Sequence, residues 1–185
     1  MRYLSIDIEA TGLAENCLII EYAMVPFDAQ TLQLEDSLQF HTFVQCPSFE
    51  ELRPVLDPWV VQHNEGLIRK AHAEGVVMSD FKEKMKAWLE APAVKSYFGN
   101  QKIVLFGKSM NAIDLPFLNR DLGWEFMRKY FNHRQLDLSG IAYAMMDLGL
   151  LPAGMESGSA LMNHLGFGAV AHTALEDARN TALMY

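Results

Sequence analysis

The chain lacks the features of a secreted or membrane-spanning protein. Its only cysteines, Cys17 and Cys46, have neither the spacing of a zinc site nor that of a disulfide framework. We therefore expect reduced thiols in a cytoplasmic protein. No apolar run approaches the ~20 residues of a membrane span, so no membrane partner is expected. The first apolar run carries Asp7 and Glu9, which argues against a signal peptide.

Positive charge is also scarce, because 15 Lys and Arg face 23 Asp and Glu, for a net charge of −8. A protein that grips long nucleic acid through its backbone needs a basic surface, so this composition argues against that class. The sequence shows no internal repeat, low-complexity tract or long linker. Its 185 residues therefore predict a single domain spanning 1–185.

The N-terminal segment predicts a strand that carries two acidic residues on one face. Apolar and polar side chains alternate over residues 3–9, and Thr11 and Gly12 then end the strand. Asp7 and Glu9 can therefore bind the same metal cluster, and if unpaired they would raise each other's pKa. The alternative is an exposed strand face, where alternating acids are common.

The remaining pattern predicts a mixed α/β fold. Strands are expected at 18–27 and 38–44, joined by a turn at 28–31, which makes a three-stranded antiparallel meander with the first strand. A continuous apolar run at 103–106 predicts a strand buried on both faces, and 134–138 predicts a last strand. Helices are expected over 60–74, 79–89 capped by Ser79, 114–122, 124–130, 139–148 capped by Ser139, 159–165 ended by Gly166, and from 173 onward.

A histidine and an acid flank the start of the expected terminal helix. Thr173 and Glu176 have the spacing of a capping box, with Thr173 as N-cap. His172 then falls at N′ and Asp177 at N4, the two positions that meet in a hydrophobic staple. A base and a metal ligand would meet at this helix start. The alternative is a surface histidine beside a capped helix.

The remaining candidate acid is Asp114, which follows the buried strand that ends at Gly107. Its loop should therefore lie at the edge of the sheet. An Asp before Leu-Pro is often only a helix cap, which is the alternative here. Together the three motifs predict that four carboxylates converge, and such a set has no evident purpose except to hold concentrated positive charge.

These motifs resemble those of the DEDDh exonuclease family over nearly the whole chain. They are Asp7-x-Glu9-x-Thr11-Gly12, Asp114 before Pro-Phe-Leu, and His172-x-Ala174-Leu175-x-Asp177. Within the family the chain is most similar to the oligoribonucleases. That similarity lies in Trp59, His63, Gly66-Leu67 and the phrase Arg134-x-Leu136-Asp137-x-Ser139.

The resemblance implies an RNase H-like mixed sheet, a three-stranded antiparallel meander plus parallel strands, flanked by helices. It also implies 3′→5′ hydrolysis with two divalent ions, Mg²⁺ or Mn²⁺. By carry-over, Asp7 would bridge both ions, Glu9 and Asp177 would complete one site, and Asp114 would hold the other ion. His172 would be the general base.

The resemblance also implies a substrate side. Leu13, Trp59 and His63 would line the pocket of the terminal base, next to the turn at Thr11 and Gly12. The residues implied for the far phosphate are Ser109, Arg134 and Ser139. Independently of the resemblance, the densest basic cluster of the chain suits a phosphate, although a solvated helix end is the alternative. This cluster comprises Arg128, Lys129, His133 and Arg134.

Four departures from oligoribonuclease affect the measuring of substrate length. The interval from Trp59 to His63 is one residue shorter than usual, and His133 replaces a usual Tyr. The interval from Gly107-Lys108-Ser109 to Asp114 is about one residue longer, and Ile141 stands where a hydroxyl residue is expected.

The favoured function is a metal-dependent 3′→5′ exoribonuclease that hydrolyses short oligonucleotides to nucleoside 5′-monophosphates. The expected substrate is single-stranded, with RNA preferred over DNA, and the expected assembly is a homodimer. The alternative is a general DEDDh exonuclease on single-stranded DNA or RNA 3′ ends, of the proofreading or ribonuclease T type. A binding or assembly module without catalysis is a third reading, which the five occupied catalytic positions oppose.

Overall fold

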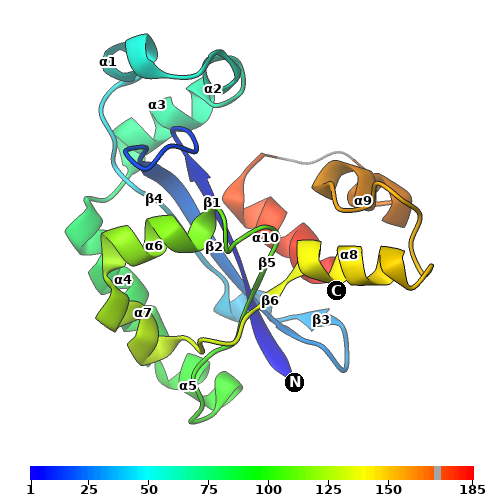
Figure 1. Cartoon of the computed structure of the whole chain (residues 1–185). Helices are drawn as coiled ribbons and strands as arrows, with labels where there is room; N and C mark the ends of the chain where they lie inside the picture. The colour runs from blue at the N-terminus through cyan, green and yellow to red at the C-terminus, as the bar shows by residue number, and fades with distance from the viewer. Residues whose placement is uncertain (169–171) are drawn as a thin grey trace.

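A six-stranded mixed sheet forms the centre of the computed structural model, which describes residues 1–168 and 172–185 (Figure 1). Strand β1 (Arg2–Ala10) pairs antiparallel with β2 (Ile19–Asp28) and parallel with β5 (Leu105–Gly107). Strand β2 also pairs antiparallel with β3 (Gln33–Leu34) and β4 (Phe40–Phe43). Strand β5 pairs parallel with β6 (Leu136–Asp137). The predicted fold class, an RNase H-like mixed sheet flanked by helices, is confirmed.

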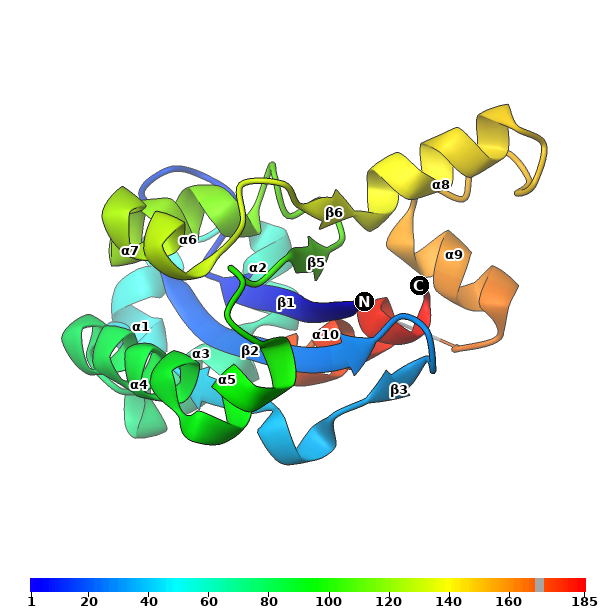
Figure 2. The ribbon, with the colours of Figure 1, turned by 90° about the horizontal axis from the view of Figure 1, so that it is seen from below.

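The helices divide into groups around this sheet. Helices α4 to α7 gather on one side, and α8 and α9 lie together on the other (Figures 1 and 2). No helix in the described ranges is long and apolar enough to cross a membrane. The α-helices are α1 (Phe49–Leu52), α2 (Pro58–His63), α3 (Glu65–Glu74), α4 (Met78–Glu90), α5 (Pro92–Phe98), α6 (Asp114–Leu122), α7 (Trp124–Tyr130), α8 (Leu138–Asp147), α9 (Gly158–Leu165) and α10 (Ala174–Leu183), and two 3₁₀ turns are η1 (Asp36–Leu38) and η2 (Arg53–Val55).

The two faces of β1 are used differently, as the alternation predicted. Its apolar face joins the largest hydrophobic cluster, where residues such as Ile6 pack with side chains of α4 and α6. On the opposite face, Ser5 Oγ donates a hydrogen bond to the Ala178 carbonyl oxygen of α10 at 2.7 Å. Ala23 of β2 packs there against Ala174 and Ala178. Small side chains therefore allow α10 to lie directly against the sheet.

The strand expected over 38–44 is found as β4, and a short additional strand, β3, pairs with β2 before η1. One expected helix is interrupted. The helix expected over 60–74 breaks at Asn64, whose backbone (φ −109°, ψ 6°) separates α2 from α3. Its side-chain amide reaches the Ala10 carbonyl oxygen at 3.5 Å. The break therefore places Asn64 beside the end of β1.

Two predicted helix caps were wrong. Ser79 lies inside α4, whose N-cap is Val77, and its hydroxyl contacts the Asp80 carboxylate. Ser139 lies inside α8, because Asp137 is the N-cap and its carboxylate accepts from the Ser139 N–H at 2.9 Å. A carboxylate is an ionised acceptor, so it replaces the serine hydroxyl as the capping group.

The close approach of α10 to the sheet predicts that Ala178→Leu destabilises the protein. The added methyl groups have no space beside Ser5, so overpacking should cost about 1–3 kcal/mol and lower Tm by about 2–10 °C. Thermal denaturation measures this. Ala144→Leu, on an exposed position of α8, is the matched control and should leave Tm nearly unchanged. Equal Tm values for both variants would contradict the packing argument.

Candidate active site and metal centre

Three carboxylates from two elements converge at the end of β1. Asp7 and Glu9 extend from the strand face that α10 covers, and Asp177 lies in the first turn of α10. One carboxylate oxygen from each lies within 4.8 Å of the others. The N-terminus of a helix carries partial positive charge, which favours an acid at the position of Asp177.

Asp114 joins this group from the segment that follows the neighbouring parallel strand β5. The loop after β5 leads to Asp114, the first residue of α6, and its side chain is buried. Its Oδ1 accepts a hydrogen bond from the Ile8 N–H at 3.0 Å. Ile8 stands between the two acids of β1, so this bond fixes the Asp114 carboxylate beside them.

The pKa values of these acids are raised, because the acids are buried close to one another. Burial raises the pKa of Asp7 well above its ordinary value, and Asp114, Glu9 and Asp177 raise it further. Burial, followed by the charge of Asp177, raises the pKa of Glu9 to about 7. Burial likewise raises the pKa of Asp114 to about 7, although the backbone hydrogen bond from Ile8 opposes the shift.

The protein supplies little cationic compensation. Within residues 1–168 and 172–185, no Lys or Arg forms an ion pair with Asp7, Glu9 or Asp114. Grouped carboxylate oxygens are the donors that hard divalent cations such as Mg²⁺ and Mn²⁺ prefer. The donor set therefore fits a divalent cation.

A buried acid of β2, which sequence reasoning missed, holds the start of α10. Glu21 Oε2 accepts a hydrogen bond from the Ala174 N–H at 3.0 Å, and its Oε1 lies 2.5 Å from His41 Nε2. Thr173 is the N-cap of α10, as predicted, but the predicted capping box was wrong: the Thr173 side chain caps no backbone N–H, and its hydroxyl lies 3.5 Å from the Glu176 carboxylate. A lone acid within the apolar run of β2 was the available signal for Glu21.

His172 lies beside the aromatic residues of α2. Its backbone has a left-handed φ of 55°, and its side chain is exposed. Its ring meets Trp59 edge-on at 5.8 Å between centroids, and Trp59 stacks on His63 at 4.4 Å. The His63 Nδ1 also lies 2.8 Å from the Trp59 carbonyl oxygen. Three residues expected at the site are therefore brought together.

An apolar cavity of about 580 Å³ adjoins the acids. Leu13, Trp59 and Ile113 line it together with Glu9. Leu13 is 77% exposed, so its side chain is accessible to a ligand. Ile113 was missed, although its place directly before Asp114 could have indicated it.

The turn after β1 owes its shape to Thr11 and Gly12. The Thr11 hydroxyl accepts from the Leu18 N–H at 2.9 Å, so Thr11 ties β1 to the start of β2. Gly12 adopts φ 151°, and a Cβ there would lie 2.9 Å from the Cys17 sulfur. The structure thus gives both residues a role in positioning Leu13.

The residues expected at the far phosphate are brought together only in part. Ser109 Oγ and Ser139 Oγ lie 2.8 Å apart, and Asp137 accepts from both backbone N–H groups. Asp137 was missed as an organising residue, although it stands in the motif. Arg134 is exposed, and among the described residues its guanidinium has no ion-pair or hydrogen-bond partner. The serines are therefore fixed, whereas Arg134 is held only through its backbone.

The fold places the chain among structures of nucleases, and no family model and no curated protein matches it. Cell-death related nuclease 4 matches with a TM-score of 0.67 and 17% identity, over 99% of this chain and 62% of that one. The zinc-bound E. coli exonuclease I–ssDNA complex matches with a TM-score of 0.72 and 17% identity, over 99% and 39%. A full-length 3′-exonuclease matches with a TM-score of 0.66 and 20% identity, over 99% and 58%. The chain thus spans between 39% and 62% of these chains.

The contact between Glu21 and Ala174 predicts that Glu21→Ala weakens the start of α10 and displaces Asp177. The loss of a cap costs about 0.5–2 kcal/mol, and metal affinity should fall by about 10–100-fold, as for other groups that orient a ligand. Glu21→Gln keeps an acceptor and should retain most of the affinity. Mn²⁺ titration of both variants checks this, and equal losses would contradict the capping role.

The raised pKa values of Glu9 and Asp114, about 7 each, predict how stability depends on pH without metal. Between pH ~4.5 and ~7 the folded state binds more protons than the unfolded state, so the free energy of unfolding falls as pH rises. Tm in EDTA should fall from pH 5 to pH 8, and Mn²⁺ should stabilise most at pH 8. Thermal denaturation of Asp114→Asn should show a flatter slope. Glu50→Gln, an exposed control, should keep the wild-type slope, and a Tm that rises over this range would contradict the account.

Proposed function

We propose that this protein is a metal-dependent 3′→5′ exonuclease. The observation that carries the proposal is the convergence of Asp7, Glu9 and Asp177 within 4.8 Å, with Asp114 fixed beside them through Ile8. The structural likeness to nucleases supports it at the level of the fold. A cluster of acids that repel each other destabilises a fold, and a bound cation would offset this repulsion.

Each acid has a proposed role that follows the family resemblance. Asp7, Glu9 and Asp177 would hold one cation, and Asp7 with Asp114 would hold the other. When bound, two divalent ions supply the charge that lowers the pKa of the attacking water and stabilises the leaving 3′ oxygen. His172 accepts the proton of that water at an imidazole nitrogen, and its exposed position leaves the ring free to reach it.

The cavity beside Glu9 suits the base of the terminal nucleotide. Leu13, Ile113 and Trp59 line the cavity and offer apolar surfaces to the faces of a base, and His63 stacks on Trp59. An apolar cavity gives affinity without reading sequence, because every base has apolar faces. The cavity therefore supports an enzyme that removes terminal nucleotides of any sequence.

The finer proposal is an exoribonuclease of short oligonucleotides that releases nucleoside 5′-monophosphates. Net charge of −8 favours a substrate with few phosphates. The Ser109–Ser139 pair offers hydroxyl donors to one further phosphate, with Arg134 near it in sequence. A homodimer in the cytoplasm accompanies this proposal, and both cysteines are free thiols.

The second candidate is a general exonuclease on single-stranded DNA or RNA. The ssDNA named for the exonuclease I neighbour favours this candidate. The cation chemistry acts on the phosphate with either sugar. Substrate length and sugar therefore separate the two candidates.

The role of His172 predicts that His172→Ala lowers kcat by about 10²–10⁴-fold with little change in KM, because the proton acceptor is lost. The rate at which a 5′-labelled oligonucleotide is shortened with Mn²⁺ measures this. His164→Ala, an exposed histidine of α9, is the control and should keep wild-type activity. A His172→Ala enzyme with wild-type kcat would remove His172 from the mechanism.

Substrate profiling tests the whole proposal. Purified protein with Mn²⁺ should shorten 5′-labelled RNA from the 3′ end, with RNA dinucleotides and five-mers cleaved faster than long RNA or DNA. Equal rates on all lengths and both sugars would favour the general exonuclease. No hydrolysis of any substrate, or full activity in Asp7→Asn, would refute the enzyme proposal.

A further inference from the structure

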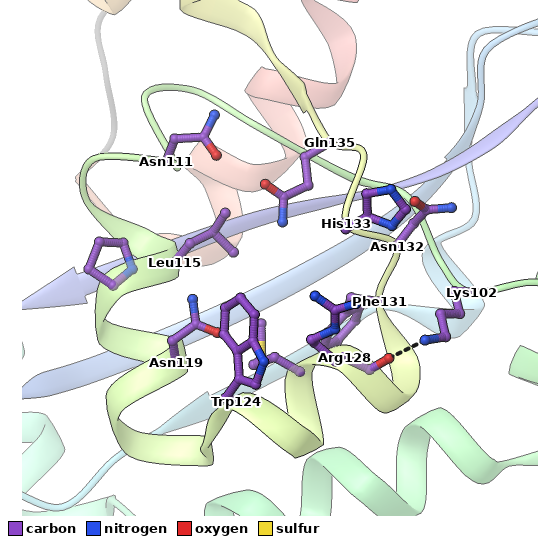
Figure 3. A pocket seen from close by; sticks show the side chains of 12 residues that line it. Lys102, Asn111, Leu115, Asn119, Trp124, Arg128, Phe131, Asn132, His133 and Gln135 are labelled. Carbon is purple, nitrogen blue, oxygen red and sulfur yellow. Dashed lines mark hydrogen bonds between the residues drawn. The ribbon is translucent and has the colours of Figure 1, made fainter.

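A second cavity, of about 330 Å³, lies between α6, α7 and the segment that leads to β6 (Figure 3). Small-molecule sites in proteins span ~300–1,000 Å³, so its size suits one nucleotide. Side chains from all three segments, such as Asn119, Arg128 and Gln135, turn toward a common space in Figure 3. The cavity is separate from the one beside Glu9.

The lining of this cavity has a charge opposite to that of the whole chain. None of its 12 lining residues is Asp or Glu, whereas Lys102, Arg128 and His133 all take part. Among the described residues Arg128 has no carboxylate partner, although the Lys102 ammonium donates to its carbonyl oxygen. The basic cluster identified in the sequence is therefore divided: Arg128 and His133 line this cavity, whereas Lys129 pairs with Glu90. The cavity concentrates positive charge on an acidic protein, which suits a phosphate.

The same cavity offers an aromatic surface. Trp124, the first residue of α7, is 61% exposed, and the Arg128 guanidinium lies 5.3 Å from its ring centroid. Asn119 and Gln135 also line the cavity, and no hydrogen bond of either side chain is found within the described ranges. An exposed indole stacks on nucleobases, and carboxamides can donate to and accept from their edges.

A short loop joins this cavity to the acidic cluster. Asn111 and Leu115 line the cavity, whereas Ile113 lines the apolar cavity beside Glu9. Asp114 lies between Ile113 and Leu115, so the two cavities flank the residues that carry one of the four acids. A single-stranded nucleic acid whose 3′ end lies at the acids can therefore continue across this loop.

We propose that this cavity binds a nucleotide of single-stranded nucleic acid upstream of the terminal one. Its base stacks on Trp124, and its phosphate lies between Arg128 and Lys102. The identity of the ligand rests on the proposed function, and the inference adds a second contact point for strands longer than a dinucleotide. Binding should therefore strengthen with length until this cavity is filled.

Fluorescence anisotropy with 5′-labelled dT12 and rU12 tests this inference. Phosphorothioate linkages, with Ca²⁺ in place of Mn²⁺, suppress cleavage. Trp124→Ala should weaken binding of both by about 5–100-fold, and Trp124→Phe should restore most of it. Arg128→Ala should also lower the slope of log Kd against log salt by about 0.7. Binding of a dinucleotide should not change.

Two exposed residues elsewhere provide matched controls. Tyr143→Ala on α8 and Lys84→Ala on α4 should bind dT12 and rU12 like the wild type. Wild-type affinity of Trp124→Ala and Arg128→Ala for both strands would overturn the inference, as would equal weakening of dinucleotide binding or no binding of either strand by the wild type.

Hydrolysis assays on the same preparations separate this inference from the proposed function. Normal cleavage of a five-mer by both variants, with wild-type affinity for dT12 and rU12, would refute only the inference. A wild-type protein that cleaves nothing, yet binds strands through Trp124, would refute the proposed function and support the inference.

Discussion

The main physical constraint on this structure is the mutual repulsion of the acids at the end of β1. Burial raises the pKa of Asp7, Glu9 and Asp114, and no Lys or Arg in the described ranges neutralises these three by an ion pair. A fold bears such a cost only where packing fixes the groups in place. The cluster is therefore suited to bind a cation that the chain itself does not supply.

Packing contacts and hydrogen bonds from residues outside the cluster hold the acids in place. Ser5 and the alanines Ala23, Ala174 and Ala178 bring α10 against the sheet, and Glu21 holds its first turn. The Ile8 N–H anchors Asp114. Loss of the α10 contacts would move Asp177 away from Asp7 and Glu9, so the small residues matter to the geometry of the site.

Periodicity predicted the sheet well, because the alternation in β1 separates an apolar face from an acidic one. It failed at Ser139, where the Asp137 carboxylate two residues away is the cap, and at the capping box of Thr173, where Glu21 accepts from the first turn of α10 instead. Glu21 lies 153 residues from Ala174, so no local pattern could reveal this contact. The cavity at Trp124 was also hidden, since it needs three segments that only the tertiary fold brings together.

The most direct test of the central claim is the binding of Mn²⁺ to metal-free protein at pH 7, measured by calorimetry in buffers of different ionisation enthalpy. Since Glu9 and Asp114 have pKa values of about 7, binding should displace protons from the cluster. The account predicts two Mn²⁺ per chain with net proton release, and loss of both effects in Asp7→Asn. Binding unchanged in Asp7→Asn, or no binding by the wild type, would contradict it.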